Sequence, residues 1–319
     1  KTILNICKYR ISISFRGMVL LCVFILTLVW VCGTGGFFPQ GYDHIVRNPI
    51  YRDLILYRWP VIYTDTNRAL CYYFGYWLLP ALLSKILFVQ CSEYMIWQGA
   101  QIVLYVYTVV NCLLISLLIC ILIHKKWQKL FSLKEIAKII FMFGAWGGLP
   151  IGGYFLFQIL GISADTVRPS IAGLSFIELW QSGTLLEHYA QGIAIVNGNI
   201  TQLAFVFNQT IPAWIATAVF LILKDEISVY AYTGFLILIC APYPVLGLGM
   251  MMSGVFLTKI IRKQVKIKEV CSIPNLCSIP FLAVTVLLYR KTLDSNLHFV
   301  VKYFYKNNSI YFSKDMNLQ

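Results

Sequence analysis

Charged residues are scarce in this chain of 319 residues. Lys, Arg, Asp and Glu together make up 12% of it, against about 25% in soluble domains. Acidic residues are rarer than basic ones: 13 Asp and Glu stand against 26 Lys and Arg, which gives a net charge of +13. Hydrophobic residues make up 59% and the mean hydropathy is +0.73. This composition argues against a soluble globular domain and predicts a membrane protein.

Several functional motifs are missing as well. The sequence has no Walker loop, no GxGxxG after a predicted strand and no HExxH, so nucleotide-driven chemistry has no support. The ten cysteines include no CxxC pair and no Cys/His group with zinc spacing. In a multi-pass protein the excess of Lys and Arg normally lies in cytoplasmic loops. We therefore predict a lipid bilayer, and no nucleic acid, as the partner of the basic residues.

Apolar runs that approach the length of a membrane span recur along the chain. A helix that crosses the hydrocarbon core needs about 20 apolar residues. Lys8, Arg10 and Arg16 precede the first run and place the N-terminus in the cytoplasm. The predicted runs are residues 17–38, 95–123, 139–160, 211–223, 228–241, 244–258 and 276–289.

Residues 70–89 are also apolar enough to cross, but the charge pattern argues against it. A crossing there would place the Lys-rich loop 124–138 outside the cell, against the positive-inside rule. Aromatic residues form an interfacial band in the segment, and Pro80 and Lys85 interrupt it. We predict that residues 70–89 lie along the outer leaflet.

The predicted fold is therefore all-α, a polytopic transmembrane helical bundle with surface-lying helices in the first extracytoplasmic loop. Residues 1–289 are expected to form one membrane domain. Residues 290–319 shift abruptly to Asn, Lys, Tyr and Ser. We expect this segment to be a polar tail that is either disordered or not native to the chain, which would make the domain an incomplete copy.

Residues 41–80 form a polar island between apolar runs. They hold three of the 13 carboxylates and four arginines, and polar residues beside membrane spans tend to be functional. Asp43 lies just beyond the outer end of the first run. It could act as a general base towards an acceptor hydroxyl or bind a divalent cation. The alternative is an N-cap for the helix that follows.

Asp53 lies ten residues later, between Arg52 and Arg58. Either arginine could pair with this carboxylate or with a phosphate, for which Arg is the favoured partner. The alternative is an interfacial amphipathic helix whose arginines reach lipid headgroups.

A second outside segment offers Glu178, Glu187 and His188 as a further carboxylate or proton carrier. The alternative is a solvated loop with ordinary surface charges. Asn208 and Gln209 are predicted at the mouth of the following span, where they could bind sugar hydroxyls or cap a helix.

The order of these elements resembles the GT-C superfamily of polytopic glycosyltransferases. In that family a first span is followed by an outer loop with an acidic residue and then by helices on the outer surface, and the aromatic segment 67–87 looks like one of those surface helices. More narrowly, four motifs look like those of a group of uncharacterised bacterial membrane proteins: GYDH at 41–44, WPVI at 59–62, YYFGY at 72–76 and FNQTIPAW at 207–214.

This resemblance implies an enzyme of the bacterial inner membrane. It would transfer a sugar from a polyprenyl-phosphate donor to a cell-envelope acceptor on the extracytoplasmic face. Asp43 would be the catalytic base. His44 stands where the family usually has a second acidic residue, so this chain has one fewer carboxylate for a divalent cation. Substrate contacts are expected from His44, Arg52, Asp53, Arg58, Glu178 and His188.

A non-enzymatic protein, either a transporter or a scaffold for envelope glycan assembly, is the rival hypothesis. Transporters place polar groups at the middle of the membrane in broken helices. Asn111 and the pair Pro242 and Pro244 are the residues that hint at such a break.

Overall fold

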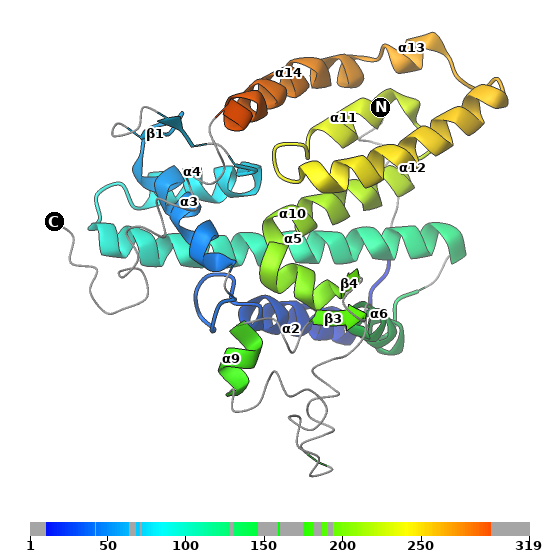
Figure 1. Ribbon diagram of the computed structural model, residues 1–319. Helices are drawn as coiled ribbons and strands as arrows, with labels where there is room; N and C mark the ends of the chain where they lie inside the picture. Colours follow the sequence, from blue (N-terminus) through cyan, green and yellow to red (C-terminus); the bar gives the residue numbers. More distant parts are fainter. Residues whose placement is uncertain are drawn as a thin grey trace. The chain divides into compact units, whose positions relative to one another are not determined.

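The computed structural model describes residues 11–41, 43–63, 68–70, 72–127, 130–145, 159, 175–181, 187–190 and 194–294. Helices dominate this part of the chain (Figure 1), which confirms the all-α prediction. The helices are α2 (Phe15–Val31), α3 (His44–Leu56), α4 (Gly75–Leu87), α5 (Glu93–Trp127), α6 (Leu133–Ala145), α9 (Phe176–Gln181), α10 (Asn199–Ile222), the 3-10 helix η2 (Ile227–Val229), α11 (Tyr230–Phe235), α12 (Pro242–Ile261), α13 (Ile267–Val270) and α14 (Ile273–Asp294).

Two short antiparallel hairpins supply the strands of the described residues. One pairs β1 (Ile62–Tyr63) with β2 (Arg68–Ala69), and the other pairs β3 (Glu187–Ala190) with β4 (Ala194–Asn197). The chain divides into two compact units, each built from two separate stretches. The first unit comprises Lys1–Asp43 and Gln98–Ile222, and the second comprises His44–Trp97 and Leu223–Gln319.

Three helices of the described residues are long and apolar enough to cross a membrane. α5 has 35 residues, α10 has 24 and α12 has 20. At about 1.5 Å of rise per residue, each reaches the roughly 30 Å of a hydrocarbon core. The predicted run 95–123 lies inside α5, and 211–223 and 244–258 fall almost wholly within α10 and α12.

Other predicted runs have different bounds in the structure. α2 ends at Val31 rather than at residue 38, because a glycine-rich turn follows. Residues 228–241 do not form one helix: α11 ends at Phe235 and short turns follow it, in which the Leu238 N–H bonds the Phe235 carbonyl. α6 covers the start of 139–160, and most of the rest of that run lies outside the described residues.

The segment 70–89 contains α4, which has 13 residues. A helix of that length spans about 20 Å, well short of a hydrocarbon core. That the segment lies along the outer leaflet stays a prediction. At the other end of the chain α14 continues to Asp294, five residues into the predicted tail, and residues 295–319 lie outside the described part.

Phe143 of α6 contacts two other helices of the first unit. Its ring meets Phe24 of α2 edge-on with centroids 6.5 Å apart, and Trp214 of α10 with centroids 5.3 Å apart. The side chain of Asn199 donates to the Phe143 carbonyl at 3.0 Å. Edge-to-face pairs of this kind add stability beyond the buried area, so one residue joins three helices.

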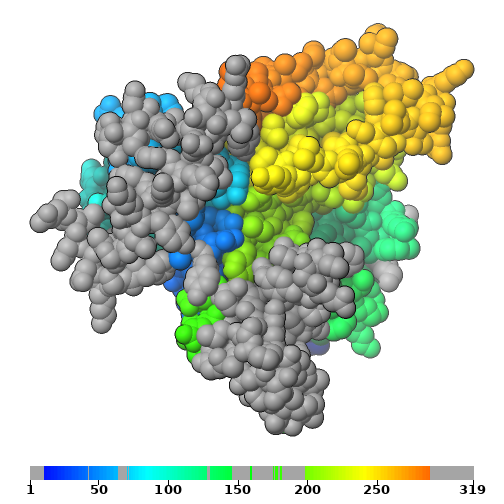
Figure 2. Space-filling view, in the orientation of Figure 1, coloured from blue at the N-terminus to red at the C-terminus, as the bar shows by residue number. Residues whose placement is uncertain are grey.

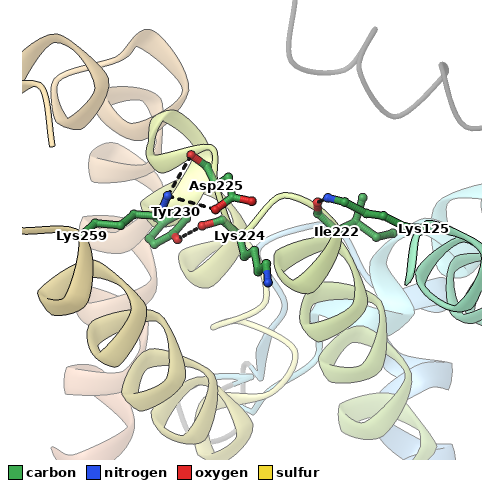
Figure 3. A network of polar contacts seen from close by, with 6 residues as sticks. All are labelled: Lys125, Ile222, Lys224, Asp225, Tyr230 and Lys259. Carbon is green, nitrogen blue, oxygen red and sulfur yellow. Dashed lines mark hydrogen bonds and ion pairs between the residues drawn. The ribbon is translucent and has the colours of Figure 1, made fainter. Parts of the chain in front are cut away.

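The C-terminal end of α10 is held by a lysine of α5. Lys125 Nζ donates to the carbonyl oxygen of Ile222, the last residue of α10, at 2.8 Å (Figure 3). Cations are favourable at this end of a helix, where carbonyl groups lack intrahelical partners.

Glycine allows the turn after α2 to approach α5. Gly35 has φ +89°, and a Cβ there would lie 2.9 Å from Tyr105 Cβ and 3.0 Å from the Gln101 carbonyl oxygen. The neighbouring Gly36 has φ +73°, but its nearest atom would be 3.8 Å away. Tyr105 also donates its hydroxyl to the Leu26 carbonyl at 2.9 Å. The backbone of the turn therefore lies directly on α5.

In the second unit, α4 begins against the turn that precedes α12. The Gly75 N–H donates to the Ile239 carbonyl at 3.2 Å. A Cβ on Gly75 would lie 2.6 Å from Ile239 Cγ2 and 2.7 Å from Cys240 Sγ, closer than real Cβ atoms approach. α3 packs on α4 in the same unit.

The two glycines of the α2 turn provide a matched test. Gly36→Ala introduces only the left-handed backbone penalty, about 1 kcal/mol. Gly35→Ala adds an overlap with α5, so we expect it to cost about 2–3 kcal/mol. Urea unfolding of the full chain in detergent measures both. Equal midpoints for the two variants would contradict the close approach of Gly35 to α5.

Candidate functional site

The polar island folds around α3, which packs on α4. Tyr51 and Ser84 share a hydrogen bond of 3.3 Å between their hydroxyl oxygens. Lys85 of α4 donates to the Tyr57 carbonyl just past the end of α3, and its ammonium lies 4.9 Å from the centre of the Trp59 ring. A cation at this end also suits the helix dipole. α3 is therefore fixed at its middle and at its C-terminal end.

Asp53 is the buried carboxylate of α3, with 3% of its surface exposed. Tyr63 of β1 donates its hydroxyl to Asp53 Oδ2 at 2.7 Å. Arg52 Nη2 donates to Oδ1 at 3.3 Å and forms an ion pair with it. The prediction that Arg52 could pair with Asp53 is confirmed. Tyr63 was missed, because nothing in the sequence links it to a residue ten positions earlier.

Burial has the largest effect on the pKa values of Asp53 and Tyr63. It raises the pKa of Asp53 above its ordinary value, while the hydrogen bond from Tyr63 and the charge of Arg52 oppose the rise. The pKa of the Tyr63 hydroxyl is also raised, first by burial and then by the Asp53 charge. Desolvation penalises the charged form of each group. Asp53 therefore holds a proton at a higher pH than an exposed aspartate would.

Arg47 is a second buried ionic group on α3, at 6% exposure. Its guanidinium hydrogen-bonds the hydroxyl of Tyr72, which is also hydrogen-bonded to Tyr73. The Tyr72 ring stacks on Trp77 of α4, with centroids 6.3 Å apart. Sequence reasoning missed this role of Arg47. No local spacing indicates it, because Tyr72 lies 25 positions further along the chain.

Asp43 and His44 lie at the start of α3. Asp43 immediately precedes the first helical residue and its side chain is exposed, a position where aspartate is favoured as a cap. His44 is 1% exposed. About 13 Å of helix separates His44 from Asp53 at 1.5 Å per residue. α3 therefore does not gather the predicted residues into one carboxylate pair.

The remaining predicted contacts are dispersed. Arg58 lies beyond the end of α3 and is exposed. Glu187 and His188 belong to β3, where Glu187 pairs with Asn197 and His188 with Val196; their side chains lie outside the described part. Asn208 lies inside α10, nine residues after its start, so it does not cap that helix; its place at the mouth of a span stays a prediction.

Glu178 has a local structural role in α9. Its carboxylate accepts from the Ser175 N–H at 2.7 Å and from the Ser175 hydroxyl at 2.8 Å. Ser175 in turn accepts from the Glu178 N–H at 3.3 Å. This reciprocal pair is a capping box, and its hydrogen bonds lower the pKa of Glu178. The Ser-x-x-Glu spacing was readable in the sequence. A substrate contact by Glu178 stays a prediction.

A divalent cation was predicted as a possible ligand of Asp43. Among the described residues, no group of three His, Cys, Asp or Glu side chains is close enough to hold a metal ion. We therefore derive no catalytic step through a metal.

Comparisons of the chain with protein-family models, with curated proteins and with solved structures found no match. The resemblance seen in the short motifs therefore stays a prediction.

Replacing Asp53 tests its burial through pH. Because the folded pKa is raised, the contribution of Asp53 to stability is full below the unfolded value near 3.8 and is lost as pH rises through the folded pKa. We expect the Tm of the wild type to fall relative to Asp53→Asn between pH 4 and pH 8. The exposed Asp225→Asn is the control and should track the wild type. Parallel curves for all three would contradict the assignment.

Proposed function

We propose that this chain is a multi-pass membrane glycosyltransferase-like protein. It would transfer a sugar from a polyprenyl-phosphate donor to a cell-envelope acceptor on the extracytoplasmic face of a bacterial inner membrane. The observation that carries the proposal is an exposed carboxylate, Asp43, directly before a helix that buried polar contacts hold in place. The three long apolar helices supply the membrane setting.

Asp43 suits the role of general base better than Asp53 does. A base must reach the acceptor hydroxyl and take its proton as the glycosidic bond forms. Asp43 is exposed, whereas Asp53 is buried and already accepts two hydrogen bonds. The function of Asp53 is accordingly to fix α3, with Tyr63 and Arg52 as its partners.

The two arginines on this part of the chain have different roles in the proposal. Arg52 is engaged by Asp53. Arg58 follows α3, whose 13 residues span about 20 Å, so it is too far from Asp43 to hold the phosphate of the same reacting bond. We assign Arg58 to lipid headgroups, for which an exposed arginine at a membrane interface is suited.

The same proposal includes the placement of α4. The basic residues before α2 favour a cytoplasmic N-terminus, and α3 and α4 would then follow on the outer side. α4 has 13 residues and is short for a crossing.

Asp43→Asn tests the catalytic role. Loss of a general base typically lowers kcat by about 10²–10⁴-fold, so we expect sugar transfer to fall by that factor while insertion and Tm stay unchanged. The assay uses purified full chain with a panel of polyprenyl-phosphate sugars. Glu93→Gln, at the start of α5, is the matched control and should retain activity. Full activity in Asp43→Asn would overturn the assignment.

A second candidate function, transport of a polar solute, is favoured by α10. Val206 has non-helical angles, φ −131° and ψ 32°, and Pro212 lies inside the helix. Between them, Asn208 is 0% exposed, and neither polar atom of its side chain has a hydrogen-bond partner among the described residues. Broken helices with polar groups line transport sites. Asn111, which the sequence suggested as a polar residue at a helix break, gives less support to transport, because its side chain donates to the Tyr107 carbonyl.

Cysteine labelling in the membrane separates the two functions. The transport candidate predicts that Asn208→Cys reacts with a water-soluble maleimide added from outside, while Ala216→Cys, a buried position of α10 two turns further on and off the Asn208 face, does not. Exposed native cysteines are first replaced by serine. Protection of both positions would contradict a water-accessible site in α10 and leave the glycosyltransferase proposal in place.

A further inference from the structure

An apolar groove lies in the second unit, where α11 contacts both α12 and α14. Its cavity volume is about 300 Å³, at the lower end of the range for small-molecule sites. The groove is open on one side rather than enclosed. Its apolar lining includes Tyr230, Phe235, Val245, Gly249, Met252 and Phe256.

α12 gives one face to this groove and leaves most of its surface uncovered. Only 11% of its most apolar stretch is buried, and Figure 2 shows the yellow atoms of α12 on the surface of the molecule. Since α12 is long and apolar enough to cross a membrane, its uncovered side would face lipid. The groove would then open into the bilayer.

One end of the groove is polar and positively charged. Val245, Gly249, Met252 and Phe256 are spaced four, three and four residues apart, so they share one face of α12. Lys259 continues this face one turn further on. Its ammonium lies 3.2 Å from Asp225 Oδ1 (Figure 3).

The contacts of Lys259 position its ammonium. Lys259 Nζ approaches both Oδ1 and the carbonyl oxygen of Asp225, at 3.2 and 3.4 Å. The lysine side chain is 14% exposed and the Asp225 side chain 71%. Tyr230, which lines the groove, donates its hydroxyl to the Lys224 carbonyl. An ammonium has three hydrogen-bond donors. Asp225 holds the ammonium of Lys259 at the end of the groove.

The charge around this end is strongly positive. Beyond Lys259 the chain carries four further cations before its next acidic residue, Glu269. These cations are all exposed: Arg262, Lys263, Lys266 and Lys268. A groove with an apolar lining and exposed cations at one end complements a lipid that has apolar chains and an anionic head.

We propose that this groove binds an anionic phospholipid, with one acyl chain along α11 and α12 and its phosphate at Lys259 and the basic residues that follow. Basic pockets at the ends of membrane helices bind anionic headgroups, with about 1 kcal/mol contributed by each Lys or Arg near the surface. This proposal does not depend on Asp43 or on the proposed transfer reaction.

The glycines of α12 provide a matched pair of variants. A Cβ on Gly249 or on Gly247 meets no atom within 4 Å, so both positions have room for the start of a side chain. Gly249 lines the groove, whereas Gly247 does not. Gly249→Leu should therefore fill the groove, and Gly247→Leu should leave it open.

The experiment titrates the purified full chain in detergent with phosphatidylglycerol or phosphatidylcholine of identical acyl chains, and measures bound lipid by native mass spectrometry. The wild type should prefer phosphatidylglycerol. Gly249→Leu should weaken binding about tenfold, while Gly247→Leu should match the wild type. Lys259→Gln should weaken phosphatidylglycerol about fivefold and leave phosphatidylcholine unchanged.

Three outcomes would overturn the proposal. They are equal binding of the two lipids by the wild type, equal effects of Gly249→Leu and Gly247→Leu, and a lipid-free dimer that Gly249→Leu alone dissociates, which would make a second copy the occupant. If circular dichroism shows that Gly249→Leu is unfolded, Ser253→Leu, which also lines the groove, replaces it with the same expected result.

Discussion

The buried carboxylate of Asp53 is the constraint on which the α3 region depends. Its two donors, Tyr63 from the hairpin and Arg52 from the same helix, offset part of the cost of removing a charge from water. Removing either donor would leave an acceptor buried without compensation. The hairpin β1–β2 and α3 are thereby joined through a buried side chain. The exposed Asp43 directly precedes the helix that these contacts fix.

Lysines recur at the ends of helices. Lys85 binds the carbonyl just after α3, and Lys125 binds the last carbonyl of α10. In both cases a long side chain from another helix brings a charge to peptide oxygens that lack intrahelical partners. Lys259 differs, because it pairs with the exposed carboxylate of Asp225. The net positive charge of this chain is thus only partly a signal of topology, since some lysines complete helix ends.

The sequence predicted the parts of the structure that depend on nearest neighbours and on long apolar runs. α5 and the Arg52–Asp53 pair follow from such local information. The division of 228–241 into η2 and α11 does not, because buried Asn275 binds the Ile227 carbonyl and the Ala231 N–H from 48 and 44 residues away. The roles of Tyr63 and Arg47 were missed for the same reason, because their partners lie in other parts of the chain. The capping role of Glu178 was local, and its spacing could have been recognised.

The contact of Gly75 with Ile239 has a mechanical consequence. The start of α4 meets the turn before α12 through a backbone hydrogen bond of 3.2 Å, and the side chains of Ile239 and Cys240 lie against Gly75. Because Gly75 has no side chain, no rotamer change on the α4 side of this contact can absorb a displacement. A shift of α4 would therefore be passed to the residues that lead into α12.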